Sequence, residues 1–329
     1  MLRFVLRRLA ASALILAIVS AVTFFLFFAV PGEPARVACG KVCTPERIAD
    51  INATLGYDKP ILVQYGEFVH GIFFGRDFVA AEETTHCHVP CLGFSVRNSE
   101  PVTNVLLDRF PATLSLAAGA AVLFLLGGVG LGVLSALRQG RPLDRIGVAV
   151  SLAGASVQIY FLGLLLQNVF VRDLHWLPRP GYTPLTDNPA KWFAGLLLPW
   201  FTLAFVSTAL YARLTRATMI EALSEDYIRA ARARGLSRRQ IYVKHAGRAT
   251  VSPVLTVFGL DFAGLLGGAI ITESVFPIHG IGELAVKSVV SKDLSMIMGT
   301  VLLAAVAVVV ANLIVDIVYA VVDPRVRIT

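Results

Sequence analysis

The sequence predicts an all-α membrane protein with six transmembrane helices, and three observations lead to this fold class. Hydrophobic residues make up 56% of the 329 residues and charged residues only 16%, whereas about a quarter of the residues in a soluble domain are charged. The mean hydropathy is +0.72. Several apolar runs approach the length needed to cross a hydrocarbon core of about 30 Å at 1.5 Å per helical residue. Lipid is therefore the expected solvent for most of the chain.

Six apolar stretches carry this prediction, and they lie at about 9–30, 112–136, 146–171, 193–212, 251–275 and 297–322. Every backbone amide in lipid must be satisfied within its own segment, so runs rich in Leu, Ala and Gly are expected to be helices. The first run follows a basic start and is longer than the 7 to about 15 apolar residues of a signal peptide. We interpret it as a retained helix.

The distribution of Lys and Arg predicts the topology. If the N-terminus is cytoplasmic, 17 of the 29 basic residues lie in inside segments, nine of them between Arg213 and Arg248. An excess of basic residues in cytoplasmic loops is the usual determinant of orientation. Both termini are therefore expected in the cytoplasm. The basic residues lie between apolar runs and not on a soluble basic face, so nucleic acid is not an expected partner.

The predicted organisation has four parts. These are an N-terminal helix at 1–30, an extracytoplasmic subdomain at 31–98, a transmembrane domain at 99–323 and a tail at 324–329. In the subdomain we expect a short helix from Pro45 to Leu55. A second expected helix, from Leu62 to Phe74, has one apolar face that suits a membrane surface or a packed lid.

All four cysteines lie in the extracytoplasmic part, at Cys39, Cys43, Cys87 and Cys91. An even number on an oxidising face predicts two disulfides, with the connectivity left open. The spacing of His86, Cys87, His88 and Cys91 also resembles that of metal ligands. We favour disulfides over a metal site because exposed thiols on this side of the membrane are usually oxidised.

Motifs for chemistry are missing from the sequence. It has no GxxxxGK[ST] loop for nucleotide phosphates, and no HExxH or GxSxG signature. The glycine run from Gly127 to Gly132 lies inside an apolar helix, where close helix packing explains it. We expect no catalytic residue, no metal and no cofactor bound by this chain.

The large basic cytoplasmic loop at 213–250 is more specific. Residues from Asp226 to Ser237 predict a helix with small residues at Ala230 and Ala231 and a break at Gly235, and a second amphipathic stretch runs from Arg238 to Arg248. Small residues allow a partner's groove to hold a short helix closely, so a cytoplasmic partner is expected to dock here.

This loop resembles the EAA loop of membrane subunits of ATP-binding-cassette importers, and the chain is similar to the B-type permease of dipeptide and oligopeptide importers. The resemblance rests on the order of Leu2–Leu9, Leu55–Pro60 with Gln64 and Tyr65, Arg109–Leu114, Leu214–Ala217, Gly267–Ile270, Glu273–Phe276 and Asp323–Arg327. It implies the type I importer permease fold in a bacterial plasma (inner) membrane. The insertion at about 79–94 is longer than the family pattern.

The resemblance also implies partners. They are a second, similar permease, two cytoplasmic ATPases that bind ATP and Mg, and an extracytoplasmic peptide-binding protein. The residues expected to couple this chain to an ATPase are Asp226, Tyr227, Ala230, Ala231, Gly235 and Leu236. Arg229 replaces the first glutamate of the general motif, which fits a peptide importer better than other importer classes. Pro253 matches the proline that follows the loop.

Polar and small residues within the predicted helices form a second candidate set. A carboxylate at membrane depth costs about 2.5 to 3.5 kcal/mol, so Asp261 is expected to face a wet cavity or to bond Asn312. Gly264 and Gly268 are expected to permit close helix packing. Glu273 completes the set of pathway or packing residues.

Two alternatives remain at this level. The same architecture imports other solutes, such as nickel or an opine, in related permeases. A membrane scaffold that docks a protein through the loop is the second alternative, although the pattern of small residues and glycine fits ATPase coupling better.

Overall fold

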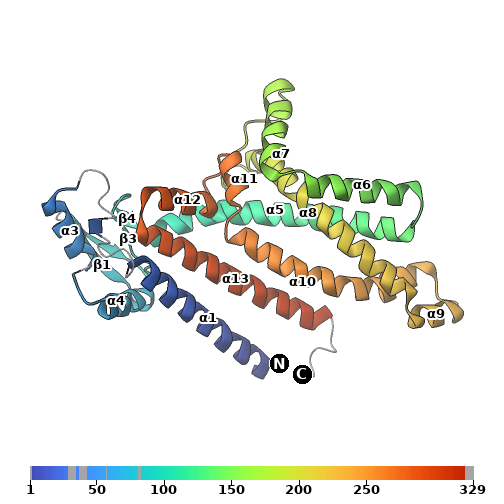
Figure 1. Cartoon of the computed structure of the whole chain (residues 1–329), viewed down its shortest axis with the longest axis horizontal. Helices are drawn as coiled ribbons and strands as arrows, with labels where there is room; N and C mark the ends of the chain where they lie inside the picture. Colours follow the sequence, from blue (N-terminus) through green and yellow to red (C-terminus); the bar gives the residue numbers. More distant parts are fainter. Residues whose placement is uncertain (1, 29–34, 37–42, 57, 81–82, 323–329) are drawn as a thin grey trace. The chain divides into compact units, whose positions relative to one another are not determined.

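The structure, a computed structural model, describes residues 2–28, 35–36, 43–56, 58–80 and 83–322 (Figure 1). It is mainly helical, as predicted. The chain divides into two compact units, Met1–Thr113 with His279–Val309 and Leu114–Ile278 with Val310–Thr329. Helices α5 and α13 each run from one unit into the other. Cys39 and the tail at 324–329 lie outside the described residues.

The first unit combines long apolar helices with a small fold of short helices and strands. Its elements are α1 (Leu2–Phe28), α3 (Pro45–Leu55), α4 (Ile61–Phe74), β1 (Arg76–Ala80), β2 (Glu83–Cys87), β3 (Phe94–Ser95), β4 (Glu100–Pro101), the start of α5 (Val102–Leu137), α12 (Ile281–Ser291) and most of α13 (Leu294–Val322). Both short helices expected in the extracytoplasmic part are present. The sequence did not predict either pair of strands or α12.

The strands β1 and β2 form an antiparallel hairpin in which Arg76 is opposite Cys87 and Ala80 is opposite Glu83. Its inner face contributes Phe78 to a cluster of buried side chains that also includes Ile51 of α3 and Phe94 of β3. The rings of Phe78 and Phe94 are stacked with centroids 5.4 Å apart. This cluster gives the part of the first unit that the sequence predicts to be extracytoplasmic a small hydrophobic core of its own.

Helix α4 packs against the outer end of α1. The ring of Phe24 lies 5.3 Å from that of Tyr65 and 5.8 Å from that of Phe68. The opposite side of α4 leaves Phe73 and Phe74 about 70% exposed, at 68% and 72%. Contact of this apolar face with the membrane surface stays a prediction.

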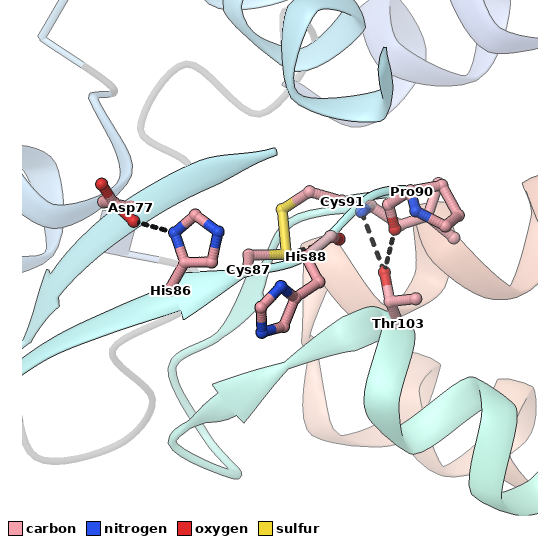
Figure 2. The surroundings of a disulfide bond; sticks show 8 residues. Asp77, His86, Cys87, His88, Pro90, Cys91 and Thr103 are labelled. Carbon is pink, nitrogen blue, oxygen red and sulfur yellow. Dashed lines mark hydrogen bonds and ion pairs between the residues drawn. A yellow bond between two sulfur atoms is a disulfide. The ribbon is translucent and has the colours of Figure 1, made fainter. Parts of the chain in front are cut away.

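A disulfide joins Cys87 at the end of β2 to Cys91, four residues later (Figure 2). Both cysteines are at most 2% exposed. The hydroxyl of Thr103, in the first turn of α5, accepts a hydrogen bond from the backbone N–H of Leu92 at 3.2 Å and donates one to the carbonyl of Pro90 at 2.5 Å. The bridged loop is thereby attached to α5, and the disulfide prediction is confirmed for this pair. Cys43 is also disulfide-bonded.

The metal alternative for the same segment has less support. The ring of His86 bonds the carboxylate of Asp77, and its centroid lies 4.7 Å from that of His88 (Figure 2). The disulfide occupies the thiols of Cys87 and Cys91. Within the described ranges, no group of three or more His, Cys, Asp and Glu residues is placed to hold a metal ion.

Replacing Cys87 with Ser is expected to lower the free energy of unfolding by about 2 kcal/mol, because a disulfide that closes a short loop removes little chain entropy from the unfolded state. Heat denaturation of the purified transporter checks this value. Alkylation of unfolded, unreduced protein is the control: it should modify Cys91 in the variant and neither cysteine in the wild type. Modification of both in the wild type would show that the bond does not form.

The second unit is a helical bundle. It comprises the rest of α5, α6 (Pro142–Ser156), α7 (Ile159–Leu166), the π-helical segment η1 (Gln167–Asp173), α8 (Pro189–Ser224), α9 (Asp226–Ala233), the π-helical segment η2 (Gln240–Ala246), α10 (Gly247–Leu266), α11 (Ile270–Val275) and the end of α13. Helix α8 lies beside both α6 and α10 (Figure 1).

Glycines on α5 allow α8 to approach closely. A Cβ added at Gly128 would lie 2.5 Å from the Tyr211 side chain, and one at Gly132 would lie 2.6 Å from the Ala212 carbonyl. Contacts below 3 Å would force the helices apart. The interpretation of the glycine run as a packing surface is confirmed at these two positions, whereas a Cβ at Gly130 would meet nothing within 4 Å.

Five described helices are long and apolar enough to span a membrane, and a sixth span exists if one bent pair counts as a single crossing. The bent pair, Gly147–Gly154 with Ile159–Asp173, turns by 101°. It replaces the continuous helix predicted at 146–171, because Val157 and Gln158 have extended backbone angles that interrupt the helix.

The fifth predicted span begins and ends earlier than expected, since the apolar span runs from Gln240 to Leu266. Helix α10 ends at Leu266 and not at residue 275. Gly268 has φ +116°, a backbone conformation that residues with a Cβ atom rarely adopt. The chain turns at this glycine before α11 begins at Ile270. Glu273 consequently lies on a separate short helix.

Candidate functional site

The basic loop at 213–250 forms the short helix that the sequence predicts, α9. Glu225, with φ −67° and ψ 149°, ends α8, and α9 begins at the next residue. Asp226 lies in the first turn of α9 and Arg232 in the last. This order of charges favours the helix, since its N-terminus carries partial positive charge and its C-terminus partial negative charge.

The two sides of α9 have different environments. Ile228 is 0% and Ala231 is 6% exposed. Both pack in a cluster with Met219 of α8 and with Ile241 and Ala246 of η2. This cluster, which we call the loop core, fixes α9 to the end of α8.

The outer side of α9 is accessible and has a small residue near its centre. Asp226, Tyr227, Arg229 and Ala230 are all exposed, and the guanidinium of Arg229 pairs with the carboxylate of Asp226. Ala230 is therefore a small residue on an accessible, largely polar surface. Of the predicted coupling residues, Ala231 faces the loop core instead, and Leu236 packs against that core.

Gly235 reverses the chain after α9. Its φ is +77°, and a Cβ there would meet nothing within 4 Å. The glycine is thus required by backbone conformation and not by crowding. The N–H of Leu236 then bonds the carbonyl of Ala231 at 3.3 Å. With this hydrogen bond the chain turns back, so that Leu236 packs against the loop core before η2 begins at Gln240.

A buried ion pair, absent from the predicted set, joins α8, the helix that precedes α9, to the start of α6. The guanidinium of Arg216 on α8 donates two hydrogen bonds to Asp144 at the start of α6, with Nε–Oδ1 2.7 Å and Nη2–Oδ2 2.9 Å. Asp144 also accepts bonds from the Ser135 hydroxyl of α5 and from the Gly140 N–H. The bonds from Arg216, Ser135 and Gly140 hold the pKa of Asp144 far below its usual range.

This ion pair was missed because its two partners are 72 residues apart. The available signal was an acidic residue in the basic turn between two helices. Asp144 is only 5% exposed, and burying a charge requires a partner.

Asp261, on α10, has its partner on α8. The hydroxyl of Tyr211 donates a hydrogen bond to Oδ2 of Asp261 at 2.9 Å. The predicted partner was Asn312, but among the hydrogen bonds of the described residues none joins it to Asp261. Tyr211 is itself fully buried and packs on Phe124 of α5, with ring centroids 4.8 Å apart. Asp261 is therefore attached to the centre of the bundle formed by α5, α8 and α10.

Replacing Tyr211 with Phe tests whether this bond is structural. It should destabilise the purified transporter by about 1 kcal/mol, the order of a hydrogen bond between membrane helices. The companion change Asp261→Ala separates the two roles of the carboxylate. Unchanged uptake and unchanged assembly with alanine would remove the pathway role, whereas lost uptake in a stable complex would support it.

The remaining candidate residues lie in different places. Gly264 on α10 meets nothing within 4 Å of an added Cβ. Gly268 lies beyond the end of that helix, so the two glycines do not form one packing face. Glu273, on α11, is 0% exposed, and its carbonyl accepts a bond from the N–H of Ile278 at 2.9 Å. Asn312 is half-buried on α13.

A second polar cluster that the sequence did not predict lies in the first unit. Glu283 of α12 pairs with Arg109 of α5 at 3.0 Å, with Lys287 at 2.5 Å and with His279 at 3.1 Å. Burial alone would raise the pKa of Glu283, but the hydrogen bonds and charges of Lys287 and His279 outweigh burial and lower it. The N–H of Ile281 donates to the Thr113 hydroxyl at 2.8 Å. These contacts attach α12 to α5.

Known proteins and protein families match this chain over nearly its whole length. Residues 1–117 match the family described as "Binding-prot-dependent transport system membrane comp, N-term", and residues 128–328 match "Binding-protein-dependent transport system inner membrane component". A probable peptide ABC transporter permease of Sinorhizobium fredii is 36% identical over 98% of this chain and 99% of its own. The dipeptide transport system permease DppB of Escherichia coli is 33% identical over 99% of both chains.

Among solved structures, the inward-facing MetNI methionine ABC transporter has a similar fold, with a TM-score of 0.52. The likeness covers 67% of this chain and 97% of that one. At 15% sequence identity it supports the fold alone.

Proposed function

The chain belongs to the binding-protein-dependent transport system inner membrane components, and we propose that it is one permease subunit of an ATP-driven importer of dipeptides or oligopeptides. The peptide assignment is supported by the relatives in Sinorhizobium fredii and Escherichia coli, which match over nearly their whole lengths. Solute passes through the bacterial inner membrane along a path of which this subunit forms half.

The observation that carries the coupling role is α9. Its outer side is exposed and carries the small residue Ala230. Its inner side packs in the loop core through Ile228 and Ala231. A force applied to α9 by a moving partner is transmitted to α8, because the loop core joins them and the Asp144–Arg216 ion pair joins α8 to α5 and α6. Protein interiors are closely packed and transmit such displacements.

The partners follow from this arrangement. A cytoplasmic ATPase holds α9, a second ATPase holds the equivalent helix of a second permease, and an extracytoplasmic binding protein delivers the peptide. ATP and Mg belong to the ATPases, so this chain needs no cofactor and catalyses no reaction. Its contribution is a bundle with two conformations that the state of the ATPases biases differently.

ATP hydrolysis by the assembled transporter tests the proposal. This chain is expressed with its second permease and ATPases, placed in lipid nanodiscs, and assayed with binding protein plus dipeptides, tripeptides or Ni²⁺. We expect peptide with binding protein to stimulate hydrolysis. If Ni²⁺ stimulates hydrolysis and peptides do not, the chain is an importer permease but its substrate is not a peptide. If no ATPase co-purifies with the chain, the membrane-scaffold alternative is favoured.

A further inference from the structure

A cavity of about 220 Å³ lies among α5, α6 and α8 in the second unit. Its walls are mostly aliphatic and include Leu131 of α5 with Val148 and Leu152 of α6. Arg213 and Arg216 of α8 lie at the cavity as well. An apolar recess with guanidinium groups beside it suits an amphiphilic ligand better than a solute that is polar throughout.

The two arginines are not equivalent. Arg216 directs both Nε and Nη2 to Asp144, which neutralises its charge. Arg213 is exposed. Among the residues that the structure describes, it makes no hydrogen bond or ion pair. The cavity therefore keeps one positive charge that is available to an anion.

The depth of the cavity relative to the membrane follows from its neighbours in sequence. Leu131 precedes the end of α5 by six residues, and the connection from α5 to α6 then contains Arg138 and Arg141, which are both exposed. Positive charges of this kind mark the cytoplasmic boundary of the membrane. The aliphatic walls consequently extend from this boundary toward the hydrocarbon core.

Two of the residues that line the cavity are accessible from outside the chain. Val148 is 40% and Leu152 is 59% exposed. Side chains of this type on a membrane-spanning bundle contact lipid chains or another membrane helix. Val148 and Leu152 therefore present an accessible aliphatic surface on α6.

We propose that this cavity binds a phospholipid of the cytoplasmic leaflet, preferentially an anionic one such as phosphatidylglycerol. The phosphodiester pairs with Arg213, and one acyl chain lies against Leu131, Val148 and Leu152. Charge complementarity and the aliphatic walls together favour this occupant, because basic pockets between transmembrane helices on the cytoplasmic side attract anionic headgroups. The bound lipid fills the gap between α6 and α8 next to the Asp144–Arg216 ion pair.

Native mass spectrometry of the complete transporter tests the assignment. The complex is delipidated and titrated with phosphatidylglycerol, with phosphatidylcholine of the same chains, or with inorganic phosphate as a competitor. The variants are Arg213→Gln, which removes the charge, and Ala217→Phe, which narrows the cavity that Ala217 lines. Arg145→Gln is the matched control, since Arg145 is exposed on α6 and does not line the cavity.

We expect Arg213→Gln to weaken phosphatidylglycerol binding about fivefold, the order of one basic residue near an anionic lipid. Ala217→Phe should reduce the number of tightly bound lipids by one for each copy of the chain, and Arg145→Gln should change neither. Equal binding of both lipids by the wild type, displacement by inorganic phosphate, or full lipid retention in Ala217→Phe would each overturn the proposal. So would a disulfide cross-link, formed with an added oxidant, between Ala217→Cys and a cysteine introduced into the second permease, because that subunit would then occupy the site.

Discussion

Replacing Ala230 with Trp is expected to reduce peptide uptake by tenfold or more while the chain still folds and inserts. Ala230 lies on the outer side of α9 and makes no part of the loop core. A large ring there would hold the ATPase away from the helix, and the loss of one central contact in an interface costs about 2 kcal/mol or more. ATP hydrolysis should also lose its response to binding protein and peptide.

The matched control is Ala230→Ser, which keeps a small side chain and should transport normally. A contrasting change at the next residue separates coupling from folding. Ala231 is 6% exposed and packs in the loop core, so Ala231→Trp should reduce expression and thermal stability as well as uptake. Wild-type uptake by Ala230→Trp would show that the outer side of α9 is not the ATPase contact.

The second large effect is expected at the ion pair. Asp144→Ala leaves the Arg216 guanidinium without its two hydrogen bonds at a largely buried position, and breaking a buried pair in this way costs about 3 kcal/mol. The melting temperature of the purified transporter should fall by roughly 5 to 10 °C. Uptake should fall too, because α8 carries α9 and would lose its attachment to the start of α6.

Asp187→Ala is the control, since that carboxylate is exposed in the connection before α8. The double variant Asp144→Leu with Arg216→Met should recover much of the lost stability, because removing both charges leaves no unpaired ion. If the double variant is as unstable as the sum of the two single variants, the two residues do not act as a pair.

Local patterns were sufficient for the elements that depend on local properties. Membrane-crossing length is a property of a continuous apolar run, and each of the five straight spans among the described residues contains most of the residues predicted for it. Helix α3 has the predicted bounds, from Pro45 to Leu55. The turn at Gly235 was also predictable, because a glycine that follows a small amphipathic helix is a common C-terminal signal.

Patterns failed where the outcome depends on backbone angles inside an apolar run. Nothing in the hydropathy of 146–171 distinguishes a straight helix from one that breaks at Val157 and Gln158. In the same way, Gly264 and Gly268 look like a packing pair on one helix, although Gly268 takes a positive φ beyond the end of α10. Apolar composition indicates that a segment lies in lipid, but it does not indicate where the helix bends or ends.

The amino-acid sequence alone was enough to predict a membrane protein, most of its apolar spans, the position of helix α9 and the family to which the chain is similar. These properties reside in composition, charge distribution and motif order along the chain. Three features became visible only in the folded chain: Ala231 faces the loop core while Ala230 faces outward, Tyr211 is the partner of Asp261, and Arg216 neutralises Asp144. Each of these depends on which helices become neighbours, and that choice is made by packing between residues far apart in the chain.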